Sequence, residues 1–90
     1  MNKKRTELIR ATLETQFSPV ELLIKDQSHL HAGHEGAKDG KGHFAVTIIS
    51  DIFEGKDKIQ RHRMVYDALK QLLATQIHAL QIKALTSAER

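Results

Sequence analysis

The sequence contains no cysteine among its 90 residues. This absence excludes disulfide bonds, thiol catalysis and a metal site built only from the chain's own thiolates. It also removes one reason to place the protein in an oxidising compartment. No apolar stretch approaches the roughly 18 residues of a membrane-spanning helix, and residues 1–10 are charged and polar, unlike a secretory signal. We therefore expect a cytoplasmic protein without membrane contact.

The length allows one compact domain over residues 1–90, with little room for an internal catalytic cavity. A site at an edge or an end, shared with another molecule, is the easier expectation. The net charge of +3 is compatible with nucleic acid, although ordinary soluble domains carry similar charges. Histidine is the unusual residue, because three of the six lie close together at His29, His31 and His34.

Two helices are predicted from apolar residues at helical spacing. Ile9, Leu13 and Phe17 indicate a helix over about residues 3–16, which ends before Pro19 because proline disfavours helical geometry in the preceding residue. A second helix is predicted over about residues 58–75, because six apolar residues share one side of it: Ile59, Val65, Tyr66, Leu69, Leu72 and Leu73.

Three strands are predicted from alternating apolar and polar residues, over about residues 20–26, 43–50 and 79–85. The second is apolar on both faces, so we expect it to be central. The order is helix, strand, strand, short turn or helix, helix, strand, an α+β architecture with a three-stranded mixed sheet. We expect residues 28–42 to form a mobile hairpin loop, since long loops in compact domains are usually functional or mobile, and residues 1–4 and 87–90 to be frayed.

Topology predicts that distant histidines meet. The first two strands should be antiparallel, whereas a helical crossover makes the second and third parallel. The starts of these two strands and the loop before the second therefore share one end of the sheet. Neighbouring strands lie roughly 4.8 Å apart, so His78, just before the third strand, should come within reach of the loop histidines, while His43 begins the second strand. This is a candidate metal-binding end face.

His62 should not join this face. Thirteen residues separate it from Thr75, which is about 20 Å along a helix. It shares a side with Ile59, Tyr66 and Leu69, so we interpret it as a half-buried structural histidine.

Imidazole suits zinc, copper, nickel and iron, whereas a closed zinc site needs four ligands and usually sulfur or carboxylate. Histidines on a loop and on one strand indicate an open site that another molecule completes. A thiolate-bearing partner is one solution, because histidine can replace some cysteines of an iron–sulfur cluster. A zinc or nickel buffer over His29–His34 and a merely solvated loop are the alternatives.

Several stretches, spread over essentially the whole chain, resemble the BolA family. They are Phe17-Ser18-Pro19, Asp26-Gln27-Ser28, His31-Ala32-Gly33-His34, Gly42-His43-Phe44, Ser50-Asp51-Ile52-Phe53-Glu54-Gly55, Arg61-His62-Arg63-Met64-Val65-Tyr66 and Ile77-His78-Ala79-Leu80. The resemblance implies a KH-like fold of the second type, with helices on one face of the sheet.

The resemblance also implies a partner, a monothiol glutaredoxin, and a bridging two-iron, two-sulfur cluster. The partner would supply its cysteine and a glutathione thiolate. This chain would supply His78 and a loop histidine, which by position after Ser28 matches His31, with His34 as the alternative. His43 would orient a ligand. The isolated protein should then hold no cofactor and be a monomer or weak homodimer.

A DNA-binding regulator is the competing hypothesis, which the KH-like fold also suggests. Lys56, Lys58, Arg61 and Arg63 would contact phosphates or a partner. Residues 33–36 match the GXXG of RNA-binding KH domains, but that motif joins two helices and this segment joins two strands, so the match is a coincidence. No nucleophile–base pair or catalytic carboxylate pair is evident, so we do not expect an enzyme.

Overall fold

The computed structural model describes residues 3–27, 42–75 and 77–90. Its elements, in chain order, are α1 (Lys3–Phe17), β1 (Glu21–Asp26), β2 (Gly42–Ile49), the 3-10 helix η3 (Asp51–Phe53), α2 (Lys58–Ala68), α3 (Lys70–Thr75), β3 (Ile77–Leu85) and the 3-10 helix η4 (Ser87–Glu89). This is the predicted order with a final 3-10 helix added. Among the described residues, no helix has the length and apolar character needed to cross a membrane.

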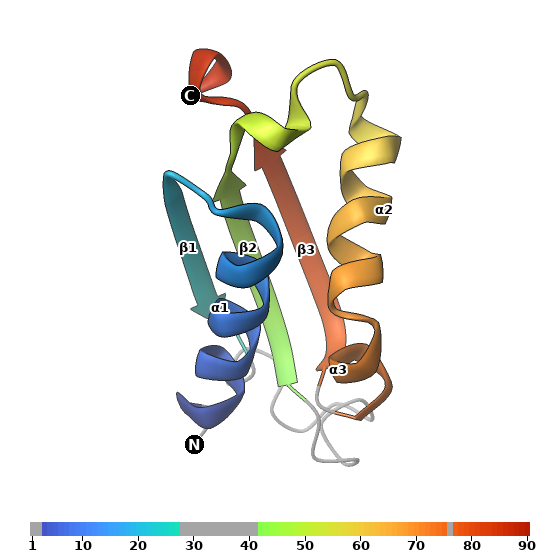
Figure 1. Cartoon of the computed structure of the whole chain (residues 1–90). Helices are drawn as coiled ribbons and strands as arrows, with labels where there is room; N and C mark the ends of the chain where they lie inside the picture. Colours follow the sequence, from blue (N-terminus) through green and yellow to red (C-terminus); the bar gives the residue numbers. More distant parts are fainter. Residues whose placement is uncertain (1–2, 28–41, 76) are drawn as a thin grey trace.

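The three strands form one mixed sheet in the order β1-β2-β3 (Figure 1). β1 runs antiparallel to β2, and β2 runs parallel to β3. The chain crosses from β2 to β3 through α2 and α3, as parallel neighbours require. β2 is buried over most of its length. The predicted mixed sheet with a central second strand is therefore confirmed, and it is compatible with the KH-like description.

Both long helices, α1 and α2, cover the same face of the sheet (Figure 1). Phe44, Val46 and Ile48 alternate along β2 and are buried on this face. Burying one such side chain contributes roughly 1.5–3 kcal/mol, so this face stabilises the fold. The other members of the buried cluster come from both helices, η3 and β3: Ile9, Leu13, Phe17, Phe53, Val65, Leu69, Ile77 and Leu80.

α1 ends where it was predicted to end, next to Pro19. Ser18 has a φ of 44°, in the left-handed region that commonly follows a helix, and its N–H donates to the Glu14 carbonyl oxygen at 3.1 Å. The buried hydroxyl of Ser50 donates to the Phe17 carbonyl oxygen at 2.6 Å. The end of α1 is thereby joined to the residue that follows β2.

The predicted helix over residues 58–75 is divided in two at Leu69. The division is slight, because the Leu69 N–H donates to the carbonyl oxygens of both Val65 and Tyr66 at 3.1 Å. The helical pattern resumes where the Leu73 N–H donates to the Leu69 carbonyl oxygen at 2.9 Å.

The predicted apolar side of this helix is correct from Val65 onward and wrong at Ile59, which is 65% exposed. Ile59 lies in the first turn of α2. Helical periodicity places a residue on one side of a helix, but it does not say how far the neighbouring sheet extends to cover that side.

The C-terminal residues 87–90, which we expected to be frayed, instead carry η4. The Ser87 N–H donates to the Asp51 carboxylate at 3.0 Å, which joins η4 to η3. Arg90 forms an ion pair with Glu21 of β1 at 2.6 Å. At the other terminus, Lys3 already belongs to α1, and residues 1–2 lie outside the described chain.

Candidate metal-ligating end of the sheet

The first residues of β2 and β3 lie side by side at one end of the sheet. Gly42 pairs with Ile77, and His43 pairs with Ala79. β1 ends at the same place, because the N–H of Gln27 donates to the His43 carbonyl oxygen at 2.8 Å. The chain on both sides of segment 28–41 therefore converges beside the start of β3, as the topology predicts.

His78 occupies an irregular position in this pairing. Gly42 and His43 are consecutive, whereas their partners Ile77 and Ala79 are separated by His78. An extra residue on one strand is a β-bulge, a feature that is over-represented next to active sites because it re-aims a side chain. We expected His78 to precede the third strand, but β3 begins at Ile77 and includes it. This correction keeps His78 at the predicted end of the sheet.

His43 lies beside this bulge with 8% of its surface exposed. The pleat places it on the face of β2 opposite to Phe44, away from the helices. A buried imidazole is suited to supporting a neighbouring ligand more than to meeting a partner protein directly. The orienting role of His43 stays a prediction.

The other predicted ligands, His31 and His34, lie outside the described residues, as do His29 and the rest of segment 28–41. Among residues 3–27, 42–75 and 77–90, no group of three or more histidine, cysteine, aspartate or glutamate side chains could hold a metal ion. A metal site at this end would therefore need donors from segment 28–41, from another molecule, or from both.

His62 belongs to a different part of the molecule. Its ring stacks on Tyr66 with centroids 4.6 Å apart and an angle of 42° between the planes. Its neighbour Arg61 donates to the carbonyl oxygen of Ala84, which is about 23 Å along β3 from Ile77 at roughly 3.3 Å per residue. The predicted separation from the metal end is therefore correct. The predicted half-burial is wrong, because His62 is exposed.

Arg61 makes several contacts within the chain, and its expected contact with phosphate or a partner stays a prediction. Its Nε donates to the Lys56 carbonyl oxygen at 2.8 Å, and its Nη1 donates to the Ala84 carbonyl oxygen at 3.1 Å. The guanidinium also binds both carboxylate oxygens of Glu89, at 2.6 and 3.2 Å. Only 11% of its side chain is exposed. Arg61 thus joins the start of α2 to the end of β3 and to η4.

Glu89 is the acidic member of this arrangement. The hydrogen bond from Arg61 is the largest cause that lowers the pKa of Glu89 from 4.5 to about 2, and the backbone N–H of Thr86 adds to the effect. The carboxylate therefore stays ionised over the whole range in which the protein would function.

Comparisons with known proteins agree with this fold. The family model described as BolA-like protein matches residues 13–89. The solved BolA domain of SufE1 from Arabidopsis thaliana is 44% identical, with a TM-score of 0.84 over 96% of this chain and 95% of that chain. This chain belongs to the BolA-like family.

Other relatives of this BolA-like chain are longer. Protein BOLA1, chloroplastic, of Arabidopsis thaliana is 43% identical over 90 residues, which cover 97% of this chain and 56% of that protein. BolA-like protein 1 of Mus musculus is 43% identical over 81 residues, which cover 90% of this chain and 57% of that protein. SufE-like protein 1 of Arabidopsis thaliana is 45% identical over 86 residues, and the chain spans only 23% of its length.

No sequence pattern predicts one feature of this BolA-like chain, a cavity at the end of the sheet opposite to His78. Ile82 and Lys83 line it from β3, and Lys58 lines it from α2. Alternation identified Lys83 only as the exposed side of a strand. Nothing in that pattern indicates that a basic helix start lies against the same strand.

Proposed function

We propose that this BolA-like chain is an adaptor that pairs with a monothiol glutaredoxin and supplies histidine ligands to a bridging two-iron, two-sulfur cluster. His78 supplies one imidazole and His31 the second, with His34 as the alternative. The partner supplies its cysteine, and glutathione supplies a further thiolate. The convergence of both flanks of segment 28–41 on the bulged start of β3 is the observation that carries this proposal.

The donor chemistry of the chain fits one part of such a site. Iron–sulfur clusters take thiolates, of which histidine can replace some. A chain without cysteine can supply only the imidazoles, and two of its histidines, His43 and His78, lie at the same end of the sheet. Imidazole ligation raises the reduction potential of a two-iron cluster above that of an all-thiolate one. The mixed complex would therefore differ from a cluster held by the glutaredoxin alone.

In this role the chain is not an enzyme. It acts in the cytoplasm in iron–sulfur cluster trafficking or in iron and redox regulation, and it binds the cluster only together with its partner. Membership of the BolA-like family supports a non-catalytic role. The sequence adds to this support, because it shows no evident nucleophile–base pair.

Visible absorption and circular dichroism test the ligand assignment. The chain is mixed with a monothiol glutaredoxin, glutathione, iron and sulfide, and its spectrum is compared with that of the glutaredoxin alone. We expect a distinct spectrum from the mixture and its loss in His78→Ala. His62→Ala is the matched control, because His62 is an exposed histidine at the other end of the molecule. A His78→Ala spectrum identical to wild type would refute the assignment.

The loop ligand is tested in the same mixture. His31→Ala should change the spectrum more than His34→Ala if His31 binds the cluster. The reverse order would assign the second ligand to His34. An unchanged spectrum in the double variant would remove segment 28–41 from the proposal.

DNA binding is the second candidate function, favoured by the exposed basic residues Lys56, Lys58 and Arg63 near the start of α2. Its support is weaker because Arg61 is occupied by Glu89 and by backbone carbonyl oxygens. With three contacting cations, the affinity for duplex DNA should fall with salt at a logarithmic slope of about −3. Lys58→Glu with unchanged DNA affinity would reject this candidate.

A further inference from the structure

A cavity of about 330 Å³ lies between the first turns of α2 and the last residues of β3. Ile82 and Leu85 are among the apolar residues that line it, and Lys58, His62 and Lys83 line it as well. A second hollow of about 360 Å³ adjoins it at the start of α2, and Lys58 and His62 line both. We call the two together the basic hollow.

Ile59 gives the basic hollow an exposed apolar residue. Ile59 lines the second hollow and is 65% exposed, although it is a large aliphatic residue in the first turn of a helix. Single exposed apolar residues are common. Here, however, Ile59 borders a concave surface whose neighbouring cavity has its own apolar wall at Ile82, so a ligand could cover both.

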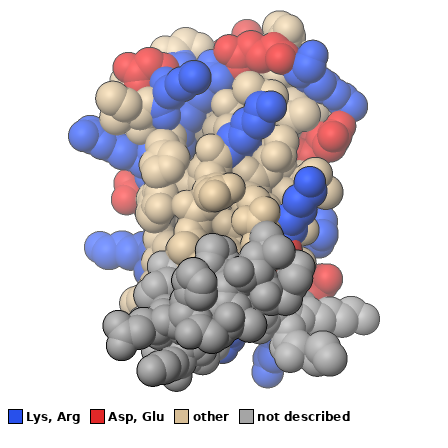
Figure 2. Space-filling view, turned by 180° about the vertical axis from the view of Figure 1, so that it is seen from behind, with Lys and Arg blue, Asp and Glu red and all other residues tan. Residues whose placement is uncertain are grey.

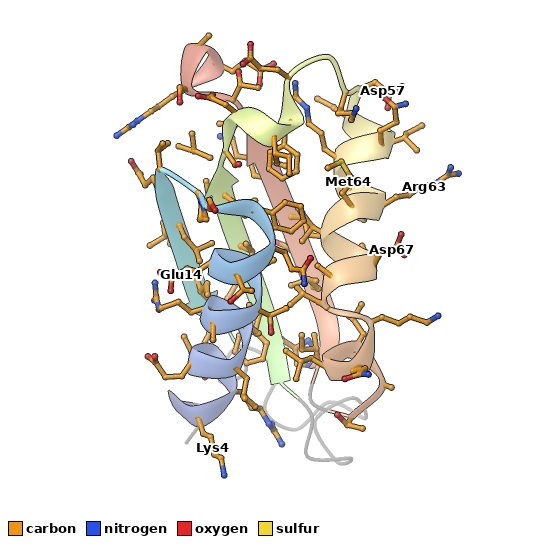
Figure 3. All side chains as sticks on the ribbon, in the orientation of Figure 1. Lys4, Glu14, Asp57, Arg63, Met64 and Asp67 are labelled. Atoms are coloured by element: carbon orange, nitrogen blue, oxygen red, sulfur yellow. The ribbon has the colours of Figure 1, made fainter. Side chains whose placement is uncertain are left out.

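The charges that line the basic hollow are of one sign. Lys58 and Lys83 are exposed, and Arg63 projects outward from α2 (Figure 3). Arg61 also lines it, but Glu89 neutralises that guanidinium. The nearest acidic residue along the helix, Asp57, accepts the Gln60 N–H in the cap of α2 and does not line the basic hollow. A carboxylate entering the basic hollow would thus meet three cations that face solvent.

The edge of β3 adds backbone groups to this surface. The carbonyl oxygen of Leu80 accepts from the Tyr66 hydroxyl at 3.3 Å, and that of Ala84 accepts from Arg61 at 3.1 Å. The carbonyl groups of Leu80 and Ala84 therefore point away from β2. Ile82 lies midway between them, so its backbone N–H and C=O also point to the outer edge of β3. The N–H of Ile82 is a donor and its C=O an acceptor, and the backbone of an extended peptide could pair with both.

The charge pattern disfavours a long polyanion. Seen from behind, Asp and Glu side chains lie among the Lys and Arg side chains around this end of the molecule (Figure 2). On the face seen in Figure 2 they interrupt a continuous basic stripe along which a phosphodiester chain could lie. A local basic cluster beside an apolar cavity is better suited to a short segment with few charges.

We propose that the basic hollow binds an acidic segment of a partner protein, in which a Glu or Asp side chain adjoins a bulky apolar side chain. The carboxylate pairs with Lys58, Lys83 or Arg63, and the apolar side chain covers Ile59 and Ile82. The site lies at the end of the sheet opposite to His78, so it is independent of cluster ligation. The chain thereby has a second interaction surface.

The test uses a hexapeptide in which Glu alternates with Leu and Phe, titrated into the ¹⁵N-labelled full chain and followed by amide chemical shifts. We expect saturable shifts over residues 58–63 and 82–85, weakened at least about tenfold by Lys83→Glu. Lys25→Glu is the matched control, an exposed strand lysine that does not line the basic hollow. Ile59→Ser should weaken binding about fivefold with little effect on folding, because Ile59 is already exposed.

Two comparison probes separate the outcomes. The peptide with Gln in place of Glu should bind at least about tenfold more weakly, and so should the peptide with Ala in place of Leu and Phe. No saturable binding at millimolar peptide, shifts centred on His43 and Ala79, or equal affinity in Lys83→Glu and Lys25→Glu would each overturn the proposal. A DNA duplex that binds more tightly than the peptide and is equally sensitive to Lys83→Glu would overturn it in favour of nucleic acid.

Discussion

The two ends of the sheet in this BolA-like chain are built in different ways. At the end near η4, side chains distant in sequence hold the backbone together: Arg61 binds Glu89 and the Ala84 carbonyl oxygen, and Ser50 binds the Phe17 carbonyl oxygen. At the other end, the pairing of β2 with β3 brings His43 beside the bulge at His78. The first end uses its polar side chains to hold the backbone together, whereas the second brings two histidines to neighbouring positions through strand pairing.

The largest effect on stability should come from breaking the Arg61 contacts. Arg61→Ala removes every bond that the guanidinium makes to Lys56, Ala84 and Glu89. We expect the free energy of unfolding to fall by about 2–3 kcal/mol, since hydrogen bonds to charged groups contribute about 1.5–3 kcal/mol. Urea denaturation measures this. Arg63→Ala, at an exposed position, should change stability by less than about 0.5 kcal/mol. Equal effects of the two substitutions would show that the Arg61 contacts are not stabilising.

A smaller loss should follow Ser50→Ala. Ser50 is buried, and its hydroxyl donates to the Phe17 carbonyl oxygen and accepts from the Ile52 N–H. A buried carbonyl oxygen without its donor costs about 1–2 kcal/mol. The change should lower the thermal midpoint, whereas Ser87→Ala, at an exposed position, should leave it nearly unchanged. A midpoint that does not move in Ser50→Ala would contradict the proposed link between α1 and β2.

The end of the sheet near η4 should also lose stability in acid. The pKa of Glu89 is lowered in the folded state to about 2 from 4.5, so its contribution to stability is fully present above pH 4.5 and is lost as the pH falls through about 2. Glu89→Gln should therefore lose less stability than wild type over that interval in a series of urea melts. Parallel losses in the two proteins would show that Glu89 is not preferentially ionised in the folded state.

The smallest effect on stability should occur at the histidine end. His78→Ala should shift the free energy of unfolding by no more than about 0.5 kcal/mol, as should His62→Ala, if His78 is kept for ligation rather than for packing. Denaturation of the isolated chain measures both. A loss of 2 kcal/mol or more in His78→Ala would place His78 among the structural residues and remove the contrast between the two ends.

The arrangement of strands could be predicted from the sequence because two independent rules agree. Alternation identified three strands, and the helical crossover fixed the parallel pairing of β2 with β3. The convergence of His43 and residue 78 follows from that pairing alone. The bulge could not be predicted, because one extra residue in a strand leaves no trace in an alternation as short as this one.

The side-chain contacts at the other end were beyond sequence reasoning. Arg61 lies 28 residues from Glu89, and no helical or strand periodicity relates the two residues. From the sequence, the basic start of α2 therefore predicts a contact with phosphate rather than an internal ion pair. Ile59 and His62 were placed on the correct side of a helix, but their exposure depends on where the neighbouring sheet ends. Periodicity carries no information about that boundary. The roles of His31 and His34 stay predictions.

Pulsed electron-nuclear spectroscopy on the reduced mixed complex tests the central proposal most directly. Only the histidines of this chain are labelled with ¹⁵N, and the glutaredoxin is unlabelled. We predict ¹⁵N couplings typical of directly bound imidazole nitrogen in wild type and in His62→Ala, and the loss of one such coupling in His78→Ala. A cluster in the wild-type complex without any ¹⁵N coupling would contradict histidine ligation by this chain.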